Sequence, residues 1–254
     1  MDVSLAGRTA LVTGGANGLG RMIVEEMLRA GARVIFTSRR DSTQALAALA
    51  KIGECHVVEV DLGAPDGVDR LTDQVLTLTG KLGILINNAG TTWGGPLETF
   101  PDRGWASVMD LNVRVPFAMV QRLLPSLEAA GTAGDPARVI NIGSIAGTFS
   151  ARLNAYSYSA SKAALHHLGR ELAAELGPRN IAVNTIVPGY FSTKMTAHIR
   201  ADEHRASQLK QRIPLGRFGE PRDIGALCVF LSSPLAAYIS GAQILLDGGL
   251  AAAC

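Results

Sequence analysis

Seven short apolar runs, rich in β-branched residues, recur along this chain of 254 residues and are separated by segments with helical spacing. The runs do not alternate apolar with polar residues, which is typical of strands covered on both faces. Parallel neighbouring strands need crossover connections, and helices supply them. We therefore predict an α/β fold with one doubly wound parallel sheet of about seven strands and helices on both faces. The predicted strands are Thr9–Gly14, Arg33–Arg39, Cys55–Asp61, Ile84–Gly90, Arg138–Ser144, Ile181–Gly189 and Ala242–Gly249.

No linker divides the chain, and we expect residues 1–254 to form a single Rossmann-type domain. The stretch 190–214 differs from its surroundings, because it is polar, has weak helical spacing and lies between Pro188 and Pro214. Such long excursions in a compact α/β domain are usually functional. We predict that residues 190–214 form a lid over the substrate.

Charge and cysteine content exclude several classes of protein. The formal net charge is only +2 and the basic residues are scattered, so we expect no nucleic-acid partner. The odd number of cysteines, three, argues against a disulfide framework, and the lack of a C-x-x-C pair argues against a structural metal site. The chain shows neither a signal-peptide pattern nor an apolar run of about 18 residues. We therefore expect a cytoplasmic protein with no membrane partner and no metal.

A glycine-rich turn, "TGGANGLG", follows the first predicted strand and opens the first predicted helix. Gly14, Gly18 and Gly20 allow a tight turn and a close approach of the backbone to a pyrophosphate, and the helix N-terminus offers N–H groups. The alternative is a tight turn that binds no ligand. Its position between a strand and a periodic helix favours a dinucleotide site, which would include Asn17 and Leu19.

The end of the second strand indicates which dinucleotide is bound. NAD sites usually carry an acidic residue about 20 residues after the glycines, whereas this chain has Ser38, Arg39 and Arg40 there. Arginine attracts a ribose 2′-phosphate and an acid would repel it, so these residues favour NADP(H). The alternative is that both arginines are ordinary surface charges, and Asp41 lies close enough to keep NAD open.

Two further strand ends supply candidate cofactor contacts. Asp61 ends the third run and is either a partner of the adenine amine or a plain turn residue, with Leu62 beside it. The fourth run ends in "NNAG", and Asn88, Ala89 and Gly90 are suited to contacting a cofactor. Strand carboxyl ends in open α/β sheets are the places where ligands bind.

Tyr158 and Lys162 lie four residues apart, about one helical turn, so they share a helix face that Tyr156 does not. A free tyrosine has a pKa near 10, too high for rapid proton exchange at neutral pH. A neighbouring ammonium and an oxidised nicotinamide ring would both stabilise the phenolate, and we predict a lowered pKa for Tyr158. The alternative is an ordinary pair on a solvated helix face.

Two polar residues complete the predicted chemical site. Ser144 ends the fifth run, where it could donate a hydrogen bond to a substrate carbonyl or simply form a turn. Asn112 lies inside a helical segment, a position where asparagine is disfavoured without a specific reason. His166 and His167 follow Lys162, and we expect them to have packing or surface roles.

The motifs together resemble the short-chain dehydrogenase/reductase family over essentially the whole chain. The resemblance implies that Tyr158 exchanges a proton with the substrate and that Lys162 binds the nicotinamide ribose and tunes the tyrosine. It also implies that Ser144 orients the carbonyl and that Asn112 supports a water relay. Three more contacts to the cofactor are implied by the "PG" and "GYFST" motifs, namely Pro188, Gly189 and Thr193.

Within the family, "NNAGTTWGGPLETFP" and "DPARVINIGSIAG" are similar to bacterial β-ketoacyl (3-oxoacyl) reductases of the rhamnolipid pathway. Asn17 departs from the family pattern, which often has a basic residue there in NADP(H) enzymes. The resemblance implies an NADP(H)-dependent reductase of a ketone carbonyl, with a 3-oxoacyl thioester as leading substrate, working as a homotetramer or homodimer. The alternatives are an alcohol, sugar or steroid dehydrogenase of the same family, or a non-catalytic NADP-binding regulatory protein.

Overall fold

The computed structural model describes residues 3–150, 154–193 and 202–253. These residues contain a parallel seven-stranded sheet in the order β3-β2-β1-β4-β5-β6-β7. The predicted fold class is therefore confirmed. The strands are β1 (Thr9–Val12), β2 (Arg33–Ser38), β3 (Cys55–Glu59), β4 (Ile84–Asn87), β5 (Ala137–Ile142), β6 (Ile181–Pro188) and β7 (Gln243–Leu246).

Every strand ends one to three residues before its predicted end. The residues that drop out, such as Gly14 after β1 and Ser144 after β5, turn away from the sheet into loops. These last residues of each run are small or polar, and they leave the hydrogen-bond ladder at the edge where a ligand can reach them. The residues between the observed and the predicted strand ends therefore belong to the loops of the candidate site and not to the sheet.

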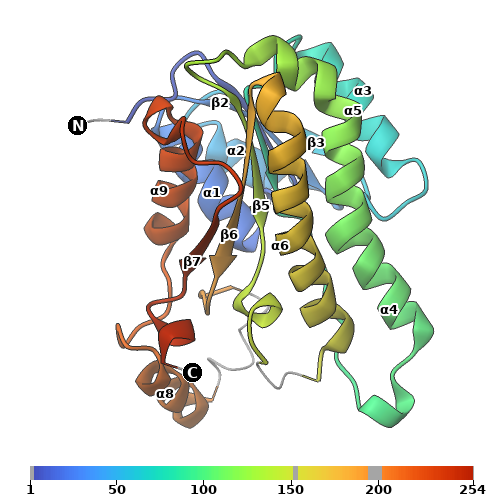
Figure 1. Cartoon of the computed structure of the whole chain (residues 1–254), viewed down its shortest axis with the longest axis vertical. Helices are drawn as coiled ribbons and strands as arrows, with labels where there is room; N and C mark the ends of the chain where they lie inside the picture. Colours follow the sequence, from blue (N-terminus) through green and yellow to red (C-terminus); the bar gives the residue numbers. More distant parts are fainter. Residues whose placement is uncertain (1–2, 151–153, 194–201, 254) are drawn as a thin grey trace.

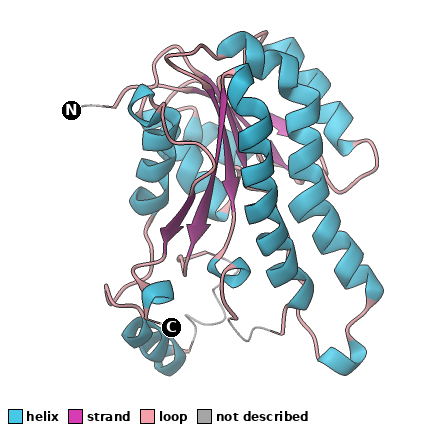
Figure 2. Ribbon diagram, in the orientation of Figure 1, coloured by secondary structure: helices cyan, strands magenta, loops and turns pink. Residues whose placement is uncertain are grey.

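Helices cover both faces of the sheet (Figure 2). On one face, α1, α2 and α9 enclose a core with Ile23, Met27 and Ile224, and on the other face α3, α5 and α6 enclose a second core with Leu71 and Leu123. Neighbouring strand residues contribute to opposite cores, which explains why the runs do not alternate. The helices are α1 (Gly18–Arg29), α2 (Thr43–Leu49), α3 (Gly67–Leu78), α4 (Asp102–Met109), α5 (Val115–Ala130), α6 (Tyr156–Leu176), α8 (Glu203–Arg212) and α9 (Pro221–Ser232).

The strand order reverses between β1 and β4, because the chain first proceeds outward to β2 and β3 and then returns to the other side of β1. In open α/β sheets a crevice forms outside the carboxyl ends of the strands at such a point. The strands in Figure 1 point toward the end of the molecule that carries α8 and the C-terminus. The glycine turn after β1 and the "NNAG" segment after β4 flank the crevice on this side.

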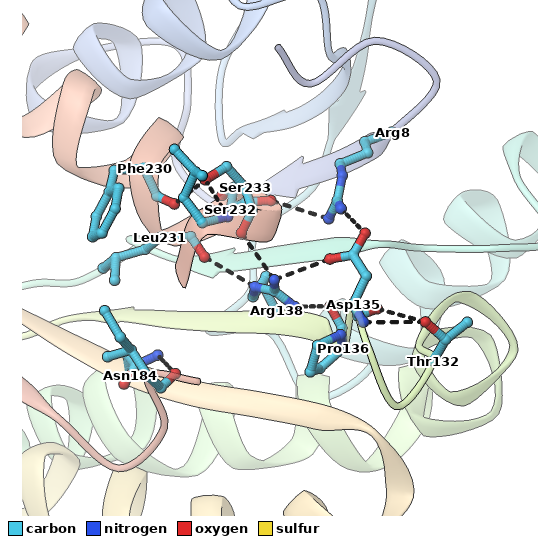
Figure 3. A network of polar contacts seen from close by, with 12 residues as sticks. Arg8, Thr132, Asp135, Pro136, Arg138, Asn184, Phe230, Leu231, Ser232 and Ser233 are labelled. Atoms are coloured by element: carbon cyan, nitrogen blue, oxygen red, sulfur yellow. Dashed lines mark hydrogen bonds and ion pairs between the residues drawn. The ribbon is translucent and has the colours of Figure 1, made fainter. Parts of the chain in front are cut away.

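A polar network at the amino ends of the strands, opposite the crevice, connects the start of β5 to the end of α9 (Figure 3). The side chain of Arg138 is 1% exposed and donates to the carbonyls of Leu231 at 3.0 Å and Ser233 at 2.9 Å. It also contacts Asp135 and the carbonyl of Pro136. The network satisfies carbonyls that a helix C-terminus leaves without partners.

Part of the predicted lid is helical, since α8 occupies Glu203–Arg212. Residues 194–201 of the lid lie outside the described part of the chain. Within the described ranges, none of the helices combines the length and the apolar character that crossing a membrane requires.

Candidate functional site

The glycine turn has the backbone that its sequence predicts. Gly14 and Gly18 adopt positive φ angles of +68° and +55°. A Cβ at Gly20 would lie 2.2 Å from the carbonyl oxygen of Gly14, so only glycine fits there. Asn17 precedes α1 without capping it through its side chain, and the first-turn N–H groups therefore have no side-chain cap. These features fit an anionic group seated at the helix N-terminus.

The ends of β2 and β3 carry the residues expected to select the dinucleotide. Arg39 and Arg40 are both exposed, and the hydroxyl of Ser38 donates to the carbonyl of Arg40 at 2.9 Å. Asp61 accepts a hydrogen bond from the N–H of Gly63 at 3.0 Å, as a turn residue does. Leu62 next to it is 3% exposed and packs in the core, so any cofactor contact from it would involve its backbone.

The segment after β4 is fastened to the glycine turn. The hydroxyl of Thr13 accepts hydrogen bonds from the backbone N–H groups of Asn88 and Ala89, both at 2.9 Å. The Asn88 side chain donates to the carbonyls of Thr13 at 2.8 Å and Gly14 at 3.3 Å. Asn88 thus fixes the shape of the crevice.

Asn112 lies in a π-helical segment, Asp110–Arg114, between α4 and α5. Single π-helical turns often occur at functional sites. The Asn112 side chain is buried, and it accepts from the N–H and donates to the carbonyl of Thr91, both at 2.9 Å. It also donates to the hydroxyl of Ser161 at 2.9 Å. These bonds tie the loop after β4 to α6.

Tyr158, Lys162 and Ser144 meet at the carboxyl end of β5. The Lys162 ammonium lies 5.7 Å from the centre of the Tyr158 ring and donates to the carbonyl of Ile142 at 2.8 Å. The Ser144 hydroxyl is hydrogen-bonded to the Tyr158 phenol. A Cβ at Gly90 would lie 3.7 Å from the Lys162 nitrogen, so the loop after β4 passes close to the ammonium. The sequence-predicted residues therefore converge on one place.

The pKa of Tyr158 shifts in the opposite direction to the one expected from the sequence. Burial raises the pKa of Tyr158 above 10.0, and the hydrogen bond from Ser144 opposes the rise only in part. Burial likewise lowers the pKa of Lys162 to about 8. The prediction that the lysine lowers the tyrosine pKa is therefore wrong for the protein groups alone, because both groups are desolvated. The phenol remains protonated at neutral pH.

The loop after β6 brings the remaining predicted contacts to the crevice. Thr193 lies 3.9 Å from the position that a Cβ of Gly18 would occupy, so the loop reaches the glycine turn. Pro188 is the last residue of β6 and is buried. A Cβ at Gly189 would lie 2.8 Å from Asp247, which explains the glycine by packing against the end of β7.

A family model described as enoyl-(acyl carrier protein) reductase matches residues 14–251 of the chain. The chain is 46% identical, over 248 residues and 97% of both chains, to the rhamnolipids biosynthesis 3-oxoacyl-[acyl-carrier-protein] reductase of Pseudomonas aeruginosa. The chain belongs to the short-chain dehydrogenase/reductase family. The resemblance inferred from the motifs is thereby confirmed.

Two further short-chain dehydrogenase/reductase comparisons show how broadly the match extends. The solved structure of the Pseudomonas aeruginosa RhlG/NADP active-site complex superposes with a TM-score of 0.95 at 45% identity, covering 98% of both chains. The 2-dehydro-3-deoxy-D-gluconate 5-dehydrogenase of Escherichia coli is 34% identical over 247 residues, 97% of this chain and 96% of that one. The family is therefore certain from whole-chain similarity, and it includes proteins named for different substrates.

In this short-chain dehydrogenase/reductase His166, for which the sequence predicted only a packing or surface role, also contacts the backbone of the site. His166 is 4% exposed, and its Nε2 lies 3.3 Å from the backbone nitrogen of Ser144. His166 lies four residues after Lys162 and eight after Tyr158, which places it on the same helix face. This spacing is the feature of the sequence that could have identified it. His167 is exposed, as expected. The described residues contain no group of three or more His, Cys, Asp or Glu side chains arranged to hold a metal.

Proposed function

We propose that the chain is an NADP(H)-dependent reductase of ketone carbonyls. The observation that carries the proposal is the convergence of Ser144, Tyr158 and Lys162 at the end of β5. This cluster lies on the same edge of the sheet as the glycine turn after β1. A proton donor beside a dinucleotide crevice is what carbonyl reduction by hydride transfer requires.

The crevice fits a dinucleotide. The positive φ angles of Gly14 and Gly18 and the lack of room for a Cβ at Gly20 form a cradle below the first turn of α1. We assign the pyrophosphate to this turn. The proposed cofactor contacts are Gly14, Asn17, Gly18, Leu19, Gly20, Ser38, Arg39, Arg40, Asp61, Leu62, Asn88, Ala89, Gly90, Tyr158, Lys162, Pro188, Gly189 and Thr193.

Exposed arginines favour NADP(H) over NAD(H). Arg39 and Arg40 follow β2 directly, and their guanidinium groups are free to reach solvent at this edge. An arginine suits a ribose 2′-phosphate because it forms charge-assisted hydrogen bonds to its oxygens. The Oδ1 atom of Asp41 accepts hydrogen bonds from the N–H and the hydroxyl of Thr43, which directs this carboxylate toward the start of α2. The relative of known structure is described as an NADP complex.

The bound cofactor supplies the hydride for the carbonyl carbon. The Ser144 hydroxyl donates a hydrogen bond to the carbonyl oxygen, and the Tyr158 phenol gives that oxygen its proton. The raised pKa of Tyr158 keeps the phenol protonated before the reaction, so the group holds the proton that carbonyl reduction needs. The Lys162 ammonium stabilises the phenolate that remains, and Asn112 holds the loop that borders it.

A 3-oxoacyl thioester is the proposed substrate. Support comes from the relative named as a 3-oxoacyl reductase and from apolar residues next to the proposed oxyanion contact. Ile145 follows Ser144 directly and packs with Val187, Phe149, Tyr190 and other apolar residues. Phe149 and Tyr190 are only partly buried, and apolar side chains beside the reacting group suit an acyl chain better than a sugar. We propose that residues 190–214 act as a lid over these side chains.

Consumption of NADPH by the purified protein tests the proposed function. The panel contains a 3-oxoacyl thioester, a trans-2-enoyl thioester, a simple diketone and a 5-keto sugar acid. We expect turnover of the 3-oxoacyl thioester to exceed that of all other compounds. Faster turnover of the enoyl thioester or the sugar acid would replace the proposed substrate, and NADPH binding without any turnover would indicate a regulatory protein.

We propose a homotetramer or homodimer in the cytoplasm. Support for assembly comes from aromatic residues that remain exposed on the consecutive helices α4 and α5. Trp105 on α4 is 46% exposed and Phe117 on α5 is 43% exposed. Exposed aromatic residues on neighbouring helices are typical of subunit interfaces. Sedimentation velocity of the purified chain tests the assembly.

A further inference from the structure

His166 projects from α6 toward the turn that follows β5. It lies one helical turn beyond Lys162, and the two residues contact neighbouring parts of the same segment. Lys162 donates to the carbonyl of Ile142, while the N–H of Ser144 donates to Nε2 of His166. Two consecutive turns of α6 thus hold the backbone on both sides of Gly143.

The turn is built around the imidazole ring. A Cβ at Gly143 would lie 2.3 Å from Nε2 of His166, and a Cβ at Gly147 would lie 2.9 Å from Cε1. The ring therefore fills the space at Gly143, and at Gly147 the ring shares that role with the α6 backbone, whose Lys162 carbonyl carbon and Ala163 nitrogen would lie 2.7 Å from a Cβ. Two other N–H groups of the turn also have partners, since Gly143 donates to the carbonyl of Ile186 and Gly147 donates to the carbonyl of Ser144. The N–H of Ser144 has His166 as its acceptor.

From this backbone bond a chain of contacts leads to the reacting groups. The Ser144 hydroxyl accepts a hydrogen bond from the N–H of Ala146 at 3.2 Å and is itself bonded to the Tyr158 phenol. A shift of the Ser144 backbone would move its hydroxyl away from Tyr158. We propose that His166 is a positioning residue that holds Ser144 against Tyr158 by accepting the Ser144 N–H at Nε2. This inference rests on the proposed ketone reduction.

The role requires a neutral imidazole with its proton on Nδ1, because a protonated Nε2 could not accept a hydrogen bond. The surroundings favour that form. Burial is the largest cause of the lowered His166 pKa, which is about 4, and the positive charges of Lys162 and Arg170 add to the effect. At neutral pH the ring therefore remains an acceptor.

Two substitutions of His166 distinguish its role as a hydrogen-bond acceptor from the space that its side chain fills. His166→Gln keeps a carbonyl oxygen near the position of Nε2, whereas His166→Leu fills part of the space without an acceptor. His167→Leu is the matched control, since its side chain is exposed and lies next to His166 in the sequence. The readouts are kcat and KM for NADPH in ketone reduction, measured at a temperature where thermal unfolding shows each variant to be folded.

We expect His166→Leu to lower kcat about 10- to 100-fold, as a misplaced reacting group does, with KM for NADPH unchanged. His166→Gln should keep most of the wild-type kcat, and His167→Leu should leave kcat unchanged. An unchanged kcat in His166→Leu, or equal losses in the Leu and Gln variants, would overturn the proposal.

A second measurement does not depend on turnover or on the Leu variant folding. The protein contains five histidines, and ¹⁵N-histidine NMR of the wild type, with His166→Gln for assignment, identifies the protonated nitrogen of His166. We expect the proton on Nδ1 at pH 7, and a proton on Nε2 would refute the proposal. Absence of ketone reduction in the wild type would reject the proposed function while leaving this test valid.

Discussion

Replacing Arg138 by leucine should destabilise the fold without altering the site. The substitution removes the donors to the carbonyls of Leu231 and Ser233, which lie at the end of α9. Leaving the buried Leu231 carbonyl without a partner costs about 1–3 kcal/mol. The Ser233 carbonyl keeps a hydrogen bond from the N–H of Ala236 at 3.2 Å and loses one worth about 1 kcal/mol, so we expect a loss of about 3 kcal/mol in unfolding free energy. Asp135 keeps an ion pair with Arg8, so no buried charge is left alone.

Urea and thermal unfolding followed by circular dichroism measure this loss. In a chain of this size 1 kcal/mol shifts the melting temperature by about 2–4 °C, so we expect a decrease of roughly 6–12 °C. Arg122→Leu is the control, since its pair with Asp69 at 2.8 Å is more than half exposed and should contribute less than about 1 kcal/mol. Similar small losses in both variants would refute the assignment of the network as a buried clamp.

The same variant should keep normal kinetics per folded molecule. Arg138 lies near the start of β5, and the candidate site begins beyond Ile142 at the other end, which is about 13 Å away along the strand. A fall in kcat at a temperature where Arg138→Leu is fully folded would show that the two ends of the sheet are coupled, which the geometry does not predict.

Three further predictions concern the cofactor, the buried histidine and the loop after β4. Arg39→Asp should weaken NADPH at least about tenfold more than NADH in fluorescence titrations, because an acid repels the 2′-phosphate; equal losses would contradict that contact. The pKa of His166 is about 4 in the fold against an ordinary 6.5, so the unfolded chain binds more protons between these values. Unfolding free energy should therefore decrease by about 3 kcal/mol as the pH falls from 6.5 to 4, and His166→Gln should lack this decrease; parallel pH profiles would refute it. Asn112→Ala removes bonds to both backbone groups of Thr91 and should cost about 2–4 kcal/mol in urea unfolding, and a loss below about 0.5 kcal/mol would argue against the tie.

The sheet was predictable because its inner strands are buried on both faces, which leaves a clear pattern of apolar runs, whereas the edge strands β3 and β7 are less buried. The convergence of Tyr158 and Lys162 was also predictable, since helical spacing alone puts them on one face. Spacing carries no information on burial, however. The direction of the Tyr158 pKa shift in the protein alone depends on how much protein surrounds the phenol, and the expectation of a lowered pKa was wrong for the protein groups alone.

His166 shows a second reason why the sequence could not predict the whole site. Its contact to Ser144 joins residues 22 positions apart in the chain, through the turn after β5, and depends on two glycines that leave space for the ring. A histidine on an apolar helix face is as compatible with packing as with a specific hydrogen bond. The same holds for Asn88, whose amide fastens the glycine turn to β4.

Tyr158→Phe tests most directly whether this phenol supplies the proton for carbonyl reduction. The substitution keeps the ring that packs beside Lys162 and removes only the hydroxyl. The measurement pairs the Kd for NADPH, from fluorescence titration, with kcat for a 3-oxoacyl thioester. We expect a Kd within about threefold of the wild type and a kcat lowered by about 10²–10⁴-fold, the range for losing a general acid. A variant that binds NADPH normally and keeps the wild-type kcat would contradict the account.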